Sequence, residues 1–101
     1  NGLSYALTEE YIFNDQGQML NPNFKNYRIY RTTDLPEIVS FLVTTHEPTG
    51  PYGAKSVSEI GINGALPAIS NAIYDAVGVR LTKPPFTAEK ILLALRKIKN
   101  I

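Results

Sequence analysis

One short stretch of the chain combines small residues, a lysine and a carboxylate just ahead of an apolar helical pattern. The residues GPYGAKSVSEIG, at positions 50–61, contain three Gly, two Ser, one Lys and Glu59. Small residues let a backbone approach a ligand closely, and successive N–H groups can form a concavity that binds anions. Neither glycine-rich nucleotide pattern, G-x-G-x-x-G or G-x-x-x-x-G-K-[ST], is present. The residues therefore indicate a loop that can approach an anionic ligand and that carries a carboxylate.

Glu59 also has a purely structural interpretation, because it stands just ahead of a predicted helix. The positive end of a helix dipole favours an acidic residue in that place. The single histidine, His46, ends an apolar run, where a polar strand-end residue is the default interpretation and a catalytic role is the alternative. The residues alone leave both interpretations of Glu59 open.

The composition excludes several classes of protein and of site. With 101 residues, the chain is one domain or a piece of one. Its 44% hydrophobic and 19% charged residues are typical of a folded globular protein, and a net charge of +1 provides no field that would attract nucleic acid. The absence of Cys excludes disulfides and thiolate metal ligands, and a single His excludes a multi-histidine metal site within the chain.

The sequence contains no targeting or membrane signal that we can identify. No run approaches the roughly 20 apolar residues of a membrane span, and no signal peptide is visible. We therefore expect a cytoplasmic location, with neither a membrane nor nucleic acid as a partner. Because the chain begins at Asn1 without Met, we expect a fragment cut from a longer protein or a processed product.

The hydrophobic pattern predicts an α+β fold, in which a short hairpin and a strand pack with two C-terminal helices. β-Forming residues around an Asn-Asp-Gln-Gly turn predict a hairpin over 9–21. A near-continuous apolar run rich in β-branched residues predicts a strand over 37–46 that is buried on both faces.

The two helices follow from apolar residues at steps of three and four. These steps predict helices over 65–77 and 87–99. Gly78 stands where a C-terminal cap is expected, and Thr87 is a good N-cap. Pro67 is compatible with the first of these helices if it lies in the first turn.

Almost the whole chain resembles one known family. The segments GAKSVSEIG, AISNAIYDAVGVR and LTKPPFTAEKILLAL resemble, in this order, the G-A-K-G-V-G-E, A-I-x-N-A-I-x-D-A-x-G-V-R and L-P-x-T-P-E-K-I-L-x-A-L patterns of that family. The opening GLSYALTEEYIFNDQGQMLNPNFKNYRI and the LPEI segment are also similar to it. The family is that of xanthine dehydrogenase and aldehyde oxidase, and the matching part is the C-terminal end of the molybdenum-cofactor-binding subunit.

The resemblance implies an activity, cofactors and partners. The activity is hydroxylation of a heteroaromatic, purine-like or aldehyde carbon with water as the oxygen source. Glu59 takes the place of the general base beside the molybdenum, and Lys55, Ser56, Val57 and Ser58 take the place of the backbone that contacts molybdopterin. No residue of this chain is expected to ligate the metal directly.

The resemblance also implies that the chain does not act alone. We expect it to form, over residues 1–101, the C-terminal fragment of a molybdopterin-binding domain. Its partners would be the remainder of that subunit, together with domains or subunits that carry 2Fe-2S clusters and often FAD. A small-molecule substrate completes the set.

This sequence departs from the family pattern at two positions. Ser56 and Ser58 stand where Gly is usual, so each adds a side chain to the loop. The SEIG ending in place of G-E-P-P is closer to the bacterial purine-hydroxylase branch. The alternative function is a non-catalytic α+β interaction or assembly module, in which Glu59 is only a helix-entry acid.

Overall fold

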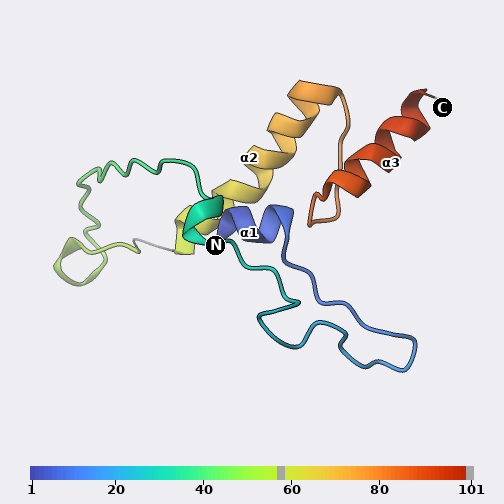
Figure 1. Cartoon of the computed structure of the whole chain (residues 1–101). Helices are drawn as coiled ribbons and strands as arrows, with labels where there is room; N and C mark the ends of the chain where they lie inside the picture. The colour runs from blue at the N-terminus through green and yellow to red at the C-terminus, as the bar shows by residue number, and fades with distance from the viewer. Residues whose placement is uncertain (57–58, 100–101) are drawn as a thin grey trace.

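A computed structural model describes residues 1–56 and 59–99 of the chain. Its α-helices are α1 (Gly2–Leu7), α2 (Glu59–Val77) and α3 (Ala88–Lys99), and two short 3-10 turns, η1 (Thr32–Asp34) and η2 (Pro51–Gly53), lie between α1 and α2. Long irregular segments join these elements and extend away from the helices (Figure 1). Within the described residues, no helix is both long and apolar enough to cross a membrane.

The predicted α+β class is confirmed only in part, because the chain is mostly helical with little strand. The hairpin expected over 9–21 is reduced to one antiparallel bridge between Phe13 and Met19. Gly17, with φ of 77°, turns the chain between the two arms. The side chain of Asn21 accepts the N–H of Ile12 at 3.0 Å and donates to the carbonyl of Glu10 at 2.6 Å.

The prediction of a strand over 37–46 is wrong for this chain. These residues form no strand or helix in the structure, and Phe41 and Leu42 are each 86% exposed. A β-ladder requires a second strand that supplies hydrogen-bonding groups, and a local pattern of residues cannot provide that partner. Among the described residues, this segment takes part in no β-bridge.

The prediction for α2 gave the correct type of element and the wrong start. The helix begins at Glu59 rather than at residue 65, so Pro67 lies inside the helix and not in its first turn. Gly61 and Gly64 have low helix propensity, and the sequence pattern therefore placed the start after them. Packing of α1 against this part of α2 compensates for that low propensity.

The other end of α2 and the start of α3 agree with the prediction. Gly78 has φ of 72°, and its N–H donates to the carbonyl of Tyr74 at 2.8 Å. The N–H of Lys90 donates to the Thr87 hydroxyl at 3.3 Å, as expected for an N-cap.

The interior of the described chain is small and is centred on α1. The buried hydrophobic side chains are Ala6, Val79 and Phe86. The N–H of Phe86 donates to the carbonyl of Ala6 at 2.6 Å, which fixes the segment before α3 against α1. Buried Ser4 accepts the N–H of Tyr30 at 2.9 Å through its hydroxyl.

Candidate functional site

The loop that precedes α2 begins with a turn anchored by Glu47. Its Oε1 accepts the Thr49 hydroxyl at 2.6 Å and the Thr49 N–H at 3.0 Å. Both hydrogen bonds lower the pKa of Glu47, and the bond from the Thr49 hydroxyl has the larger effect. The N–H of Glu47 also donates to the carbonyl of Gly53 at 3.2 Å, which closes residues 47–53 into a compact loop. This loop lies apart from the helices, at the left of Figure 1.

Two residues of this loop have left-handed backbone conformations. Tyr52 has φ of 56° and points fully into solvent, whereas Gly53 has φ of 73° and is buried. A Cβ on Gly53 would overlap the ring of His46 and lie 3.0 Å from its Cγ. His46 therefore packs against the loop backbone, and Gly is required at position 53 by both space and conformation.

The residues singled out by the sequence lie between this turn and α2. Lys55 and Ser56 are exposed and belong to no helix or strand, and Glu59 is the exposed first residue of α2. Val57 and Ser58, the other two expected cofactor contacts, lie outside the described residues. Lys55, Ser56 and Glu59 are thus close along the chain, at one end of a long helix.

The helix that carries Glu59 is held from the side by α1. A Cβ on Gly2 would overlap the Cβ of Ala65 and lie 3.0 Å from the carbonyl oxygen of Ile62. The backbones of α1 and α2 approach this closely because residue 2 has no side chain. The contact lies one to two turns after Glu59, so α1 fixes the direction of the first turns of α2.

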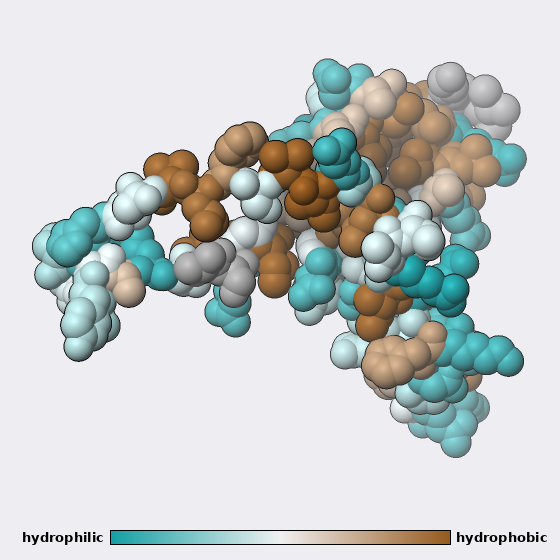
Figure 2. Space-filling model, turned by 60° about the vertical axis from the view of Figure 1, so that its left-hand side comes forward, coloured by the Kyte–Doolittle hydropathy of each residue, from teal (hydrophilic) through white to brown (hydrophobic). Residues whose placement is uncertain are grey.

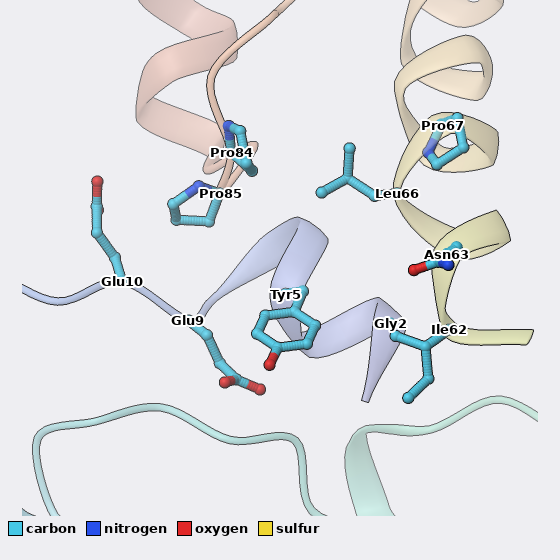
Figure 3. Close-up of a pocket in the computed structure, with 10 residues that line it drawn as sticks. All are labelled: Gly2, Tyr5, Glu9, Glu10, Ile62, Asn63, Leu66, Pro67, Pro84 and Pro85. Atoms are coloured by element: carbon cyan, nitrogen blue, oxygen red, sulfur yellow. The ribbon is translucent and has the colours of Figure 1, made fainter. Parts of the chain in front are cut away.

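A mainly apolar pocket of about 490 Å³ lies beside the same contact (Figure 3). Leu66 extends from α2 toward Pro84 and Pro85, and Tyr5 of α1 lies below them. The full lining is Gly2, Tyr5, Glu9, Glu10, Ile62, Asn63, Leu66, Pro67, Pro84 and Pro85. Neither Glu59 nor Lys55 lines this pocket, so this apolar recess beside α2 and the expected chemistry are separate.

The two carboxylates at the rim of the pocket already have partners. Glu9 accepts the Tyr27 hydroxyl at 2.7 Å, and this hydrogen bond, with desolvation, raises the pKa of Tyr27 to about 12. Glu10 forms a salt bridge of 3.1 Å with Lys90 of α3. Both acids therefore connect elements of the fold and are poor candidates for acid–base chemistry.

The described part of the chain does not form a metal site by itself. Across residues 1–56 and 59–99, no group of three or more His, Asp or Glu side chains is placed to hold a metal ion.

Two features of the site region were missed by sequence reasoning. The pocket is built from α1, α2 and the segment before α3, which are distant in sequence, so no local motif signals it. The contact between His46 and Gly53 was also missed, although a Gly after a Pro-Tyr pair is a signal for a turn with positive φ.

Curated relatives and solved structures are similar to nearly the whole chain, whereas no family model matches it. The probable hypoxanthine oxidase XdhD of Escherichia coli K12 is 43% identical over 95% of this chain and 10% of that protein. The aldehyde oxidoreductase molybdenum-binding subunit PaoC of the same strain is 37% identical over 90% of this chain and 13% of its own length. The xanthine dehydrogenase molybdenum-binding subunit of E. coli O157:H7 is 36% identical over 89% of this chain and 12% of its length.

The fold is also similar to part of a solved enzyme. Quinoline 2-oxidoreductase from Pseudomonas putida 86 matches with a TM-score of 0.79 and 28% identity, over 95% of this chain and 13% of that one. The chain therefore spans only 10% to 13% of the length of these proteins.

Proposed function

This chain is homologous to a segment of the molybdenum-binding subunits of xanthine dehydrogenases and aldehyde oxidoreductases, and on that premise we propose that residues 1–101 form the C-terminal part of the molybdopterin-binding domain of a molybdenum hydroxylase. The observation that carries the proposal is the match over 95% of the chain, which includes the loop and helix around Glu59. Because the chain spans about a tenth of such proteins, the activity is that of the complete enzyme.

The residues of the loop suit an anionic organic cofactor. Lys55 supplies a positive charge, and the backbone N–H groups of Lys55 and Ser56 donate to no protein acceptor within the described residues. Unpaired N–H groups beside a lysine are a typical environment for an anion. Lys55 and Ser56, with Val57 and Ser58 next in the chain, would hold the molybdopterin, while the remainder of the subunit forms the opposite side.

Glu59 is proposed as the general base. The bound cofactor supplies the redox chemistry, namely two-electron oxidation of a carbon centre with water as the oxygen source. The carboxylate of Glu59 takes the proton from the attacking oxygen, which makes that oxygen a better nucleophile. The position of Glu59 at the start of α2 leaves its side chain accessible, and the packing of α1 against α2 restricts where the carboxylate can lie.

The proposed substrate is a heteroaromatic, purine-like or aldehyde carbon compound. The higher identity to a probable hypoxanthine oxidase, 43% against 37% for an aldehyde oxidoreductase subunit, supports the purine-like class. Electrons would leave through 2Fe-2S clusters, and often through FAD, on other domains or subunits of a cytoplasmic enzyme.

The competing proposal is a non-catalytic interaction module in which Glu59 only stabilises the start of α2. The observation in its favour is that Glu59 is exposed and stands at the positive end of the helix. In that case, loss of the charge would affect stability slightly and turnover hardly at all.

Glu59→Gln in the complete enzyme separates the two proposals. This variant preserves size and hydrogen bonding but removes the base, and general-base catalysis is worth about 10²–10⁴-fold in rate. Turnover should fall by at least about 100-fold while molybdenum content is retained. Glu89→Gln is the matched control, because Glu89 is also an exposed acid in the first turn of a helix. Equal turnover in the two variants would support the interaction module.

A further inference from the structure

The turn at residues 47–53 is ordered by its own hydrogen bonds. Within the described residues, every hydrogen bond formed by positions 47–54 stays inside that range. The turn lies on the arm at the left of Figure 1, and in Figure 2 this arm projects from the rest of the molecule and ends in mainly hydrophilic side chains. The turn therefore owes its shape to its own residues and not to packing on the helices.

Glu47 takes part in most of these hydrogen bonds. Its carboxylate accepts the hydroxyl and the N–H of Thr49, and its carbonyl accepts the N–H of Gly50 at 3.2 Å. Its own N–H donates to the carbonyl of Gly53 and so joins the start of the turn to its end. Hydrogen bonds to a carboxylate are stronger than those between neutral groups. Loss of the Glu47 side chain is therefore the single change most suited to opening the turn.

The backbone of the turn is held in an unfavourable conformation. The N–H of Gly53 donates to the carbonyl of Gly50 at 3.3 Å, with Pro51 and Tyr52 between them. A turn with Pro in the second position and positive φ in the third normally has Gly or Asn there, whereas here Tyr52 has φ of 56° and ψ of 17°. Such strain persists only where the surrounding contacts maintain it, and it is concentrated at functional sites.

The end of the turn leads directly into the segment proposed to hold the cofactor. The N–H of Ala54 donates to the carbonyl of Pro51 at 3.0 Å, and Lys55 and Ser56 follow. The N–H groups of Lys55 and Ser56 have no acceptor within the described residues, so the preceding turn determines how these two residues leave it. A loop that is already held in its binding conformation loses less entropy when the ligand binds, and it binds more tightly.

We propose that Glu47 is a positioning residue for the cofactor loop at residues 55–58. Its carboxylate maintains the turn at 47–53, and the turn holds Lys55 and Ser56 ready for the anionic part of molybdopterin. Glu47 acts through these residues and touches neither the cofactor nor the substrate. This inference rests on the proposed function, because it takes residues 55–58 as the segment that holds molybdopterin.

The rate at which the complete enzyme releases molybdopterin tests this inference. Glu47→Ala should increase that rate at least about threefold, because a single hydrogen bond typically changes an equilibrium by about 2- to 10-fold. Glu47→Asp should restore the rate to within about twofold, since an Asp side chain accepts the N–H two residues further along in an Asx turn. Release is measured as the molybdenum and the pterin fluorescence that remain with the protein after dilution.

A second variant approaches the same hydrogen bond from its donor. Thr49→Val removes the hydroxyl, keeps the shape of the side chain, and should also increase release. Because both changes break one contact, the double variant with Glu47→Ala should release molybdopterin no faster than Glu47→Ala alone. Additive effects of the two changes would overturn the proposal.

Glu37→Ala is the matched control, because Glu37 is an exposed acid on the same arm and forms no salt bridge within the described residues. Equal release by Glu47→Ala and Glu37→Ala would overturn the role of Glu47. A lower melting temperature of Glu47→Ala with unchanged release would also overturn it and leave Glu47 a purely structural residue. If the unmodified complete enzyme held no molybdopterin, the proposed function itself would fail. The two failures are therefore distinguishable.

Discussion

Replacement of Gly2 by Ala should loosen the N-terminal half of α2. The added Cβ would overlap Ala65 and lie 3.0 Å from the carbonyl oxygen of Ile62. Both obstacles are short or backbone groups that cannot rotate away, so the helices must separate. Overpacking of this kind costs typically about 1–3 kcal/mol.

Gly64→Ala is the matched control on the same helix. A Cβ at position 64 meets nothing within 4 Å. Ala is favoured over Gly in a helix by about 0.5–1 kcal/mol, so this variant should stabilise α2. The two Gly→Ala changes are therefore expected to have opposite signs.

Hydrogen exchange of the α2 amides in the complete subunit measures both effects locally. At 1.4 kcal/mol per factor of ten, Gly2→Ala should increase exchange over 61–67 by about 5- to 100-fold. Gly64→Ala should decrease it by about 2- to 5-fold. If Gly2→Ala left exchange unchanged, the close packing of α1 on α2 would not determine the position of the helix.

Three further outcomes are expected. Thr87→Ala removes the hydrogen bond from the Lys90 N–H and should destabilise α3 by about 1 kcal/mol, measured by hydrogen exchange of the amides in its first turn. Thr82→Ala, outside the helices, should leave the exchange of these amides unchanged. Folding raises the pKa of Tyr27 from 10.0 to about 12. The hydrogen bond from the Tyr27 hydroxyl to Glu9 should therefore stabilise the fold fully below pH 10, and this stabilisation should be lost as the pH rises toward 12. A titration of phenolate absorbance, compared with that of Tyr27→Phe, checks this. The isolated 101-residue chain should hold no molybdenum tightly and show no hydroxylase activity, and stoichiometric metal on purified material would contradict that expectation.

The sequence was sufficient where structure depends on neighbours along the chain. The Thr87 cap, the Gly78 end of α2 and the turn at Gly17 each follow from the conformational preference of one or two residues. The start of α2 was not predictable in this way, because tertiary contact with Gly2 compensates for the low propensity of the glycines between 59 and 65.

The segment over 37–46 shows where prediction from local sequence fails. Its pattern indicates a strand, but strand formation depends on a partner, and the described chain contains none. The candidate site divides in the same way. The sequence predicted Glu59 ahead of a helix over 65–77, whereas in the structure it is the first residue of α2. The apolar pocket beside Leu66 arises from three distant segments and had no sequence signal.

The most direct test of the central claim is the rate of the first turnover in Glu59→Gln enzyme with a full complement of molybdenum. Rapid mixing with a saturating purine or aldehyde substrate isolates the chemical step from substrate binding and from later electron transfer. If Glu59 is the general base, this rate should be at least about 100-fold below that of the unmodified enzyme, with Glu89→Gln unaffected. A first-turnover rate close to that of the unmodified enzyme would contradict the account and leave Glu59 as a helix-entry residue.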